Sequence, residues 1–361
     1  MSATIQGSIC VTGVTGFLGS WVVEMALREG LTVRGTCRDV QKASFLMNLD
    51  GADERLKLFG GCDLGSVGSF NDAIEGCTTV IHTASPFFLV SDDEKGMENL
   101  VRPAVEGTKN VLETCKILGV KRVVLTSSTA AVYVVYGSKG KDYTFTEEDW
   151  SDEKTLLEKK NYYSLSKTRA EKLAWDISKM EGCPFKLCVM NPCLIFGPML
   201  PGQTHLNTSC MVILRFVTGD VKEIKRECMN IVDVRDVARA HVLAALQPED
   251  WKGWGNRFLL VANETSPMTR DIVDILRSSP RLSDEQKSQL ATQESEEIPL
   301  PVMGVIPPYQ TKFDLKKSLS PNSEGGLGLE KYIGTEEMVN GSVKSLLENG
   351  FDAMHHYTLT Q

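Results

Sequence analysis

SICVTGVTGFLGSWVVEMALRE, residues 8–29, joins a short apolar run, a glycine-rich turn and a helical pattern. Gly13, Gly16 and Gly19 lie in the turn, where glycine allows a sharp bend, close approach of backbone to a pyrophosphate and tight packing of helix on strand. Phosphates bound there would meet a helix N-terminus, whose free N–H groups and dipole favour anions. Because the triplet lies between a strand and a helix, it predicts a dinucleotide-binding turn.

The first half of the chain alternates short apolar runs with longer helical patterns. Strands are expected at residues 9–11, 32–37, 56–59, 79–83, 122–126 and 186–190. Helices are expected near residues 17–29, 41–49, 67–75, 93–118 and 155–181. Such alternation implies right-handed crossovers and a parallel sheet covered on both faces. The predicted fold class is therefore α/β, with a Rossmann-type doubly wound parallel sheet.

The order of elements changes after Pro192. We expect helices near 207–218 and 234–246, strands near 228–233 and 256–262, an irregular segment over 278–330, and a last helix near 335–349. A chain of 361 residues is long for one core. We predict a dinucleotide-binding domain of residues 1–192, to which 228–247 return, and a smaller, mostly C-terminal substrate-binding lobe of residues 193–227 and 248–361. The substrate pocket is expected beyond the carboxyl ends of the strands.

Composition and charge exclude several function classes. The net charge of −8 argues against nucleic acid or an anionic membrane as the main partner. No apolar run reaches about 18 residues, so no membrane span is expected, and the first strand begins too early to leave room for a signal peptide. The ten cysteines are scattered without metal-ligand spacing, so we expect reduced thiols, no metal site and a cytoplasmic location. The oligomeric state cannot be read from the sequence.

Two polar clusters follow the predicted strands and suit carbonyl chemistry. Ser128 lies in a hydroxyl cluster that closes the strand at 122–126, and Tyr163 precedes Lys167 by four residues on a predicted helix. Residues at i and i+4 share one helix face, so the phenol and the ammonium can share a site. The ammonium would lower a phenol pKa that is ordinarily near 10, and the serine hydroxyl could bind the same substrate oxygen. Together they suit proton transfer coupled to hydride transfer from a nicotinamide.

Each cluster also has a structural interpretation. Tyr-x-x-x-Lys occurs by chance in many helices, and Ser-Ser-Thr after a strand commonly forms a cap or turn. The order and spacing of the glycine turn, the serines and the Tyr/Lys pair favour the catalytic interpretation. Tyr162 competes with Tyr163, but its i+4 position is Ser166, so we expect Tyr162 to line the pocket or to pack.

Further motifs extend along nearly the whole chain, with least support in residues 270–310. They are residues 12–19, Cys37-Arg38-Asp39, Cys62-Asp63-Leu64, 82–86, 106–113, 126–128, 160–168, Asn191-Pro192, 232–238 and Phe313-Asp314. Together they resemble the extended short-chain dehydrogenase/reductases, in the branch of dihydroflavonol reductase and cinnamoyl-CoA reductase. Lys-Asn-Tyr-Tyr at 160–163, with Asn-Thr-Ser at 207–209, looks most like the cinnamoyl-CoA reductase side.

The resemblance implies an NAD(P)-dependent oxidoreductase acting on a small carbonyl or alcohol substrate. It assigns catalytic roles to Ser128, in preference to Ser127, and to Tyr163 and Lys167, while His82 is expected to pack within its strand. The residues that the resemblance places around the cofactor are Thr12, Gly13, Gly16, Phe17, Leu18, Gly19, Arg38, Lys42, Asp63, Leu64, Ala84, Ser85, Pro86, Tyr163, Lys167 and Pro192.

The end of the second predicted strand bears on the choice between NAD and NADP. NAD enzymes of this fold usually place a carboxylate there to bind the ribose 2′-hydroxyl. Here Arg38 ends the strand, and its guanidinium can bind a 2′-phosphate with two parallel hydrogen bonds. The resemblance adds Lys42 as a second contact. Asp39 follows directly, and a shift of one residue would place it at the ribose instead. We favour NADP(H) over NAD.

The predicted function is an NADPH-dependent reductase of an aldehyde or ketone, which can run in reverse as an alcohol dehydrogenase. One alternative is a nucleotide-sugar epimerase or dehydratase, or a hydroxysteroid dehydrogenase, that uses NAD; Arg38 counts against it. Another is a non-catalytic dinucleotide sensor, although such proteins usually lose the tyrosine or the lysine. Two departures from the family pattern are Ala104, where many members have a relay asparagine, and residues 134–141, which leave the substrate class open.

Overall fold

A seven-stranded parallel sheet forms the centre of the fold. The computed structural model describes residues 7–86, 95–133, 139, 142–262, 266–295, 305–306 and 311–351. Within them the strands run in the order β12-β7-β5-β4-β1-β2-β3, all parallel. The strands are β1 (Ser8–Thr12), β2 (Val33–Thr36), β3 (Leu56–Phe59), β4 (Cys77–His82), β5 (Arg122–Thr126), β7 (Lys186–Pro192) and β12 (Arg257–Leu260). The strand order reverses direction between β1 and β4, and this confirms the predicted doubly wound fold class.

Burial on both faces explains the apolar composition of the central strands. Ile9 and Val11 in β1, and Val123 and Val124 in β5, are fully buried. Strands that are covered on both sides show little polar alternation, as observed here. The register pairs the last residue of β1 with the last residue of β4, and the latter with the penultimate residue of β5. The carboxyl ends of these strands therefore meet at one edge of the sheet.

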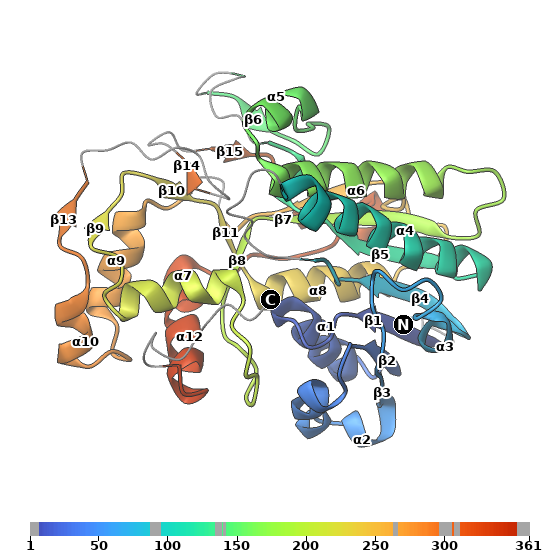
Figure 1. Cartoon of the computed structure of the whole chain (residues 1–361), viewed down its shortest axis with the longest axis horizontal. Coiled ribbons are helices and arrows are strands. Elements are labelled where there is room, and N and C mark those ends of the chain that lie inside the picture. The colour runs from blue at the N-terminus through green and yellow to red at the C-terminus, as the bar shows by residue number, and fades with distance from the viewer. Residues whose placement is uncertain are drawn as a thin grey trace.

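Helices cover both faces of the sheet (Figure 1). α4 (Arg102–Ile117) and α6 (Tyr162–Ser178) pack together over one face, and α1 (Phe17–Arg28) and α8 (Val234–Ala245) pack together over the other. The shorter segments of this half are η1 (Gln41–Asn48), α2 (Ala52–Arg55), α3 (Asn71–Ile74), η2 (Met97–Val101), η3 (Thr129–Ala131) and α5 (Glu153–Glu158).

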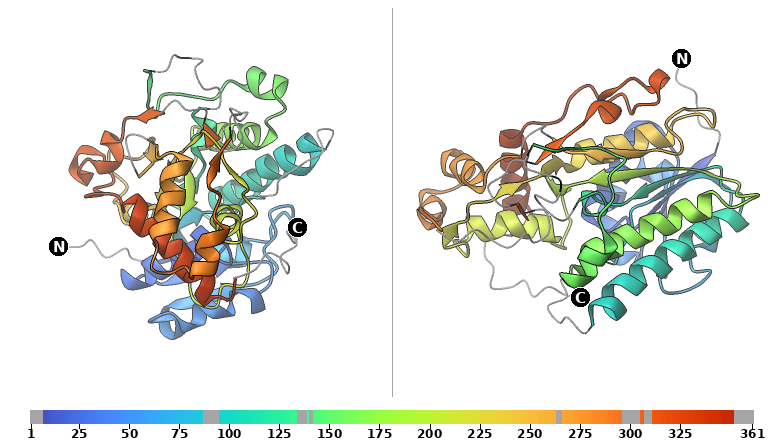
Figure 2. Two further views of the ribbon diagram at one scale, coloured as in Figure 1. Left: turned by 90° about the vertical axis from the view of Figure 1, so that its left-hand side faces the viewer. Right: turned by 90° about the horizontal axis from the view of Figure 1, so that it is seen from above.

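A second group of helices lies beside the sheet rather than on it (Figure 2). It comprises α7 (Thr208–Val217), α9 (Thr269–Ser278), α10 (Asp284–Gln289) and α12 (Thr335–Glu348). Short strand pairs accompany it: β8 (Leu194–Phe196) with β11 (Ile231–Asp233), β9 (Glu223–Ile224) with β13 (Gln293–Glu294), β10 (Cys228–Met229) with β14 (Val305–Ile306), and β6 (Thr144–Phe145) with β15 (Lys312–Phe313). The remaining short helices are α11 (Lys316–Leu319) and η4 (Asn322–Glu324).

One loop, residues 198–207, connects this second group of helices to the glycine turn. The indole Nε1 of Trp21 on α1 donates a hydrogen bond to Pro198 O at 2.7 Å. Gln203 Nε2 donates to Thr15 O within the glycine turn at 3.3 Å. The loop ends at Asn207, the N-cap of α7. The starts of α1 and α7 are therefore joined by one short segment.

The helix expected over residues 155–181 is in fact two helices. α5 ends at Glu158, Lys160 has a positive φ of 52°, and α6 begins at Tyr162. The side chain of Asn161 accepts a hydrogen bond from Ser164 N at 3.1 Å and so caps α6. Asparagine is a favoured N-cap because it satisfies an otherwise free N–H group. As a result Tyr163 lies in the first turn of its helix rather than in the middle.

Other expectations need smaller corrections. Residues 41–48 form a 3-10 helix instead of an α-helix, and the helix expected at 67–75 is limited to α3. The strand expected at 228–233 is divided into β10 and β11. β12 pairs with β7 in the main sheet, although residues 248–361 were expected in the substrate-binding lobe. β12 lies at the edge of the main sheet, where its three apolar residues and Arg257 are all buried. The wider division into domains stays a prediction.

Candidate active site

The glycine turn after β1 fits an anionic group. Gly13 has a φ of +73°, a left-handed conformation that favours glycine. A Cβ on Gly19 would lie 2.3 Å from Gly13 O, so α1 packs directly on the turn. Within the described residues no side chain caps α1 at Gly16, and its first turn carries no acidic residue. The free N–H groups and the helix dipole can therefore hold the pyrophosphate of a dinucleotide.

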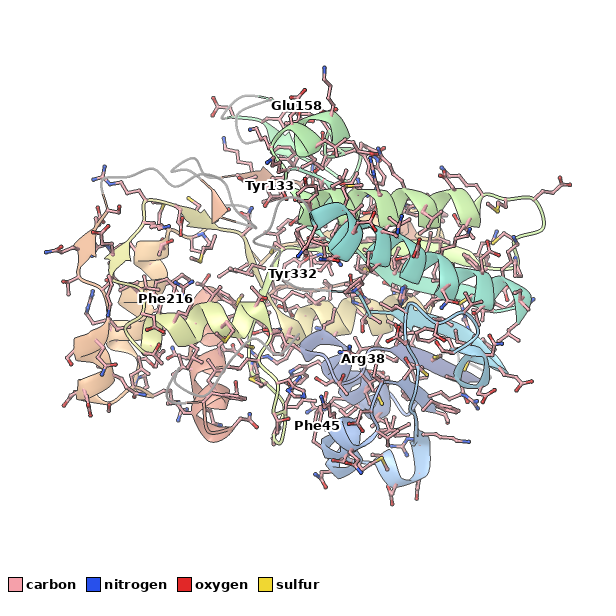
Figure 3. The ribbon with its side chains drawn as sticks, viewed as in Figure 1. Arg38, Phe45, Tyr133, Glu158, Phe216 and Tyr332 are labelled. Atoms are coloured by element: carbon pink, nitrogen blue, oxygen red, sulfur yellow. The ribbon has the colours of Figure 1, made fainter. Side chains whose placement is uncertain are left out.

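The two cations expected at a 2′-phosphate follow β2: Arg38 lies in the loop after the strand and Lys42 in η1. Arg38 and Lys42 are exposed, and Figure 3 shows Arg38 in the part of the molecule formed by α1 and β1–β3. The Asp39 carboxylate is engaged locally, because its Oδ1 accepts a hydrogen bond from Gln41 N at 2.9 Å. Burial lowers the pKa of His205, and so does the positive charge of Lys42 and Arg38. These positively charged surroundings fit the 2′-phosphate of NADP better than the ribose 2′-hydroxyl of NAD.

The loop after β3 is held in place by α4. Asp63 Oδ1 accepts a hydrogen bond from Gly65 N at 2.8 Å. Asn110 Nδ2 donates to Leu64 O at 3.2 Å and to Ser66 O at 2.8 Å. Asn110, to which the sequence assigned no role, therefore fixes the loop that carries Asp63 and Leu64.

The end of β4 links the glycine turn to Lys167. Thr12 Oγ1 bonds to His82 Nδ1 at 2.8 Å and accepts a hydrogen bond from Ala84 N at 3.1 Å. Burial, assisted by the charge of Lys167, lowers the pKa of His82 to about 3, so the imidazole is neutral and serves to hold Thr12. Ser85 Oγ accepts a hydrogen bond from Lys167 Nζ at 2.9 Å. Pro86, also assigned to the cofactor, follows at the end of this described segment.

Ser128, Tyr163 and Lys167 come together beyond the carboxyl ends of β4 and β5. Burial raises the pKa of the Tyr163 phenol, and a hydrogen bond with the Ser128 side chain acts in the opposite direction. Burial lowers the pKa of Lys167 to about 8, although the Glu171 carboxylate raises it. The expected lowering of the phenol pKa needs correction, because burial dominates and raises it. Lys167 Nζ lies 5.9 Å from the Tyr163 ring centroid and donates its hydrogen bond to Ser85 Oγ. At neutral pH the phenol therefore keeps its proton.

A cavity of ≈ 270 Å³ joins these three side chains to the glycine turn. The predicted site residues that line it are Gly13, Gly16, Phe17, Leu18, Gly19, Ser85, Ser128, Tyr163, Lys167 and Pro192. The predicted cofactor residues outside its wall are Thr12, Arg38, Lys42, Asp63, Leu64, Ala84 and Pro86. The remaining wall includes side chains that the sequence did not assign: Thr83, Tyr133, Asn161, Cys193, Leu194, Ile195, Thr208 and Ser209.

The alternatives Ser127 and Tyr162 have other partners. Ser127 Oγ donates to Glu171 Oε2 at 2.6 Å. The ring of Tyr162 packs on Gly96, where an added Cβ would lie 2.1 Å from Tyr162 Cδ2. Sequence reasoning missed Glu171, although its place four residues after Lys167 on the same helix face was a usable signal.

A known protein family matches more than half of this chain. The model of the NAD dependent epimerase/dehydratase family matches residues 9–254. The chain belongs to this family. It is similar to cinnamoyl-CoA reductase 1 of Arabidopsis thaliana, with 39% identity over 351 residues that cover 95% of this chain and 90% of that protein.

The fold of this chain is similar to solved structures of reductases over most of their length. Yeast methylglyoxal/isovaleraldehyde reductase Gre2, complexed with NADPH, has a TM-score of 0.77 and 28% identity, covering 95% of this chain and 99% of that one. Vestitone reductase from alfalfa (Medicago sativa L.) has a TM-score of 0.71 and 28% identity, covering 96% and 100%. These comparisons confirm the predicted resemblance to the reductase branch of the extended short-chain dehydrogenases and the class of NAD(P)-dependent oxidoreductases.

Three further observations concern the part of this chain that the structure describes. None of its helices is long and apolar enough to cross a membrane. Its histidines, cysteines and carboxylates include no group of three or more that could hold a metal ion. All ten cysteines fall within the described residues, and each is a free thiol.

Proposed function

We propose that this protein is an NADPH-dependent reductase of a small aldehyde or ketone. Tyr163 is the proton donor, Lys167 the cation beside it, and Ser128 the group that binds the carbonyl oxygen. The observation that supports this most strongly is the cavity that the three side chains share with the glycine turn. The nicotinamide, when bound, supplies the hydride.

The hydroxyl groups of Ser128 and Tyr163 are arranged for one substrate oxygen. Ser128 Oγ accepts a hydrogen bond from Ala130 N at 3.1 Å, so its own proton remains to be donated. The Ser128 and Tyr163 side chains are hydrogen-bonded to each other. A carbonyl oxygen entering between them can accept a hydrogen bond from both, and developing negative charge on it is then stabilised. Tyr163 can deliver its proton as that charge develops.

The cofactor and substrate assignments rest on separate observations. Arg38 follows β2 and Lys42 lies in η1, while the Asp39 carboxylate accepts a hydrogen bond from the main chain; this favours a 2′-phosphate and hence NADP(H). The yeast relative is described as complexed with NADPH, and its name gives two aldehyde substrates. Residues 1–192 with 228–247 would bind the cofactor, and 193–227 with 248–361, apart from β12, the substrate.

Substitution of Tyr163 by phenylalanine tests the proposal. Wild-type protein should consume NADPH in stoichiometric amounts with members of a panel of aldehydes, ketones and acyl-CoA thioesters. Tyr163→Phe should lower turnover by about 10²–10⁴-fold with NADPH binding retained, because a positioned acid is removed. Tyr162→Phe is the matched control, since that ring packs on Gly96, and should leave turnover near wild type. Full turnover in Tyr163→Phe would contradict the proton-donor role, and interconversion of a nucleotide sugar without net NADPH loss would favour the epimerase alternative.

A further inference from the structure

A buried ion pair lies directly behind Ser128 and Lys167. Glu171 lies on α6 one turn after Lys167, and its side chain is 0% exposed; that of Arg257, at the start of β12, is 6% exposed. Arg257 Nε donates to Glu171 Oε1 at 2.6 Å. Burial of charge is unfavourable unless it is fully paired, and a buried pair is weak evidence for stability alone. Its place beside the proposed reacting groups suggests another reason for keeping it.

The Glu171 carboxylate gathers donors that belong to the active-site framework. Ser127 Oγ and Asn191 Nδ2 donate to Oε2 at 2.6 and 2.9 Å, and Trp175 Nε1 donates to Oε1 at 3.3 Å. The same Asn191 amide also donates to Ser128 O at 3.1 Å. The amide therefore ties the main chain of Ser128 to the buried carboxylate.

Arg257 extends this arrangement to the other end of the turn after β5. Its Nη1 donates to Glu147 O at 2.9 Å and to Asp149 O at 2.5 Å. Two residues later Ser151 Oγ donates to Ala130 O at 2.8 Å, and its N–H donates to Ala131 O. The short helix η3, which Ser128 caps, is thus held at its start through Asn191 and further along by the segment that Arg257 anchors.

Glu171 also provides a negative charge near the Lys167 ammonium. The titratable groups facing Lys167 within the described chain are Tyr163 and Glu171 on α6 and His82 on β4. Burial keeps the phenol and the imidazole neutral at neutral pH. The Glu171 carboxylate is therefore the negative charge of this group, and it favours the ammonium form of Lys167.

We propose that Glu171, Asn191 and Arg257 form a positioning unit of the active site, which fixes the main chain of Ser128 and places a negative charge behind Lys167. This inference rests on the proposed reductase function, because Lys167 and Ser128 are its proposed site residues. None of the three side chains is assigned contact with substrate; they act through Ser128 and Lys167.

The pH dependence of cofactor affinity and of turnover separates this role from a merely structural one. As pH rises through about 8, Lys167 loses its proton, so NADPH affinity and turnover of the wild-type enzyme should both fall. In Glu171→Gln the Lys167 ammonium loses the negative charge that favours it. The pH at which NADPH affinity and turnover have fallen by half should therefore move down by about one unit. Turnover at neutral pH should drop by about tenfold or more, as expected for a displaced catalytic group. NADPH affinity is measured by fluorescence titration, independently of turnover.

Three further variants keep the test decisive. Glu171→Gln leaves Arg257 unpaired, and this should lower thermal stability. The double variant Glu171→Gln/Arg257→Met removes both charges. It should restore thermal stability, but the pH midpoint of NADPH affinity and turnover should stay lowered. Asn191→Ala keeps the carboxylate; it should lower turnover while the midpoint stays in place. Glu153→Gln is the matched control, because Glu153 pairs with Arg169 and Lys172 of the same helix, and should change neither quantity.

The outcomes distinguish failure of the positioning unit from failure of the proposed function. The positioning unit would be overturned if Glu171→Gln and Glu171→Gln/Arg257→Met both kept the wild-type pH midpoint and the wild-type turnover per folded molecule. That result would stand even if the enzyme reduces carbonyls. Wild-type protein that binds NADPH but reduces no carbonyl would overturn the proposed function, while the midpoint of NADPH binding would still decide on Glu171.

Discussion

Gly19→Ala tests whether the close packing of α1 on the glycine turn is needed for cofactor binding. The new Cβ would lie 2.3 Å from Gly13 O, 2.9 Å from Gly13 C and 2.9 Å from Thr83 Oγ1. Two of these atoms are backbone, so relief requires the helix start to move by roughly 1 Å, since interiors are close-packed. Overpacking of this kind destabilises by about 1–3 kcal/mol. For a chain of 361 residues the melting temperature should then fall by about 1–4 °C.

The displacement also reaches the N–H groups proposed to hold the pyrophosphate. We expect the Kd for NADPH to rise at least about tenfold, which corresponds to about 1.4 kcal/mol. Fluorescence titration with NADPH and thermal unfolding measure the two effects. Gly334→Ala is the control for cofactor binding, because an added Cβ there meets nothing within 4 Å. It replaces the N-cap glycine of α12, so it should lower the melting temperature slightly while the Kd for NADPH stays at the wild-type value. If Gly19→Ala melted and bound NADPH as the wild-type protein does, the account of this turn would be refuted.

Arg38→Ala should weaken NADPH binding by about 10–100-fold, the value of a charge-assisted hydrogen bond, and should change NADH binding by less than about twofold; equal losses in the two titrations would show that Arg38 does not bind the 2′-phosphate. Asn161→Ala removes the cap of α6 and should lower stability by about 1 kcal/mol, together with turnover, because Tyr163 lies in the frayed turn. Asp152→Ala removes the equivalent cap of α5, where Thr155 N donates to the aspartate at 2.8 Å, and should lower stability alone. Equal turnover in these two cap variants would contradict the coupling between the cap and Tyr163.

The sheet could be predicted because its strands are short apolar runs bounded by turn residues. Gly13 marks the first turn by its positive φ and Gly19 by the close packing of α1, and the central strands show little polar alternation. The break between α5 and α6 was missed because residues 155–181 are helical in pattern throughout. Asn161 and Ser164 give a cap signal only when they are read together, and a positive φ at Lys160 has no signature in a lysine.

The site was predictable where its residues follow one another in known spacing. Tyr163 and Lys167 are one turn apart, so one helix brings both to the cavity. The pKa of Tyr163 could not be predicted, since it depends on burial by segments distant in sequence. The same holds for Glu171 and Arg257, which are 86 residues apart and meet only because β12 joins the sheet next to β7.

The loop at residues 198–207 has a consequence for redesign of the enzyme. Gln203 bonds to the glycine turn, and the loop leads directly to Thr208 and Ser209 in the cavity wall. A library that randomises this loop to broaden the range of accepted substrates would therefore also disturb the glycine turn that is proposed to bind the dinucleotide. Its variants would need screening for substrate range and for cofactor binding. Leu194 and Ile195 reach the same cavity from β8 and offer the engineer a separate starting point.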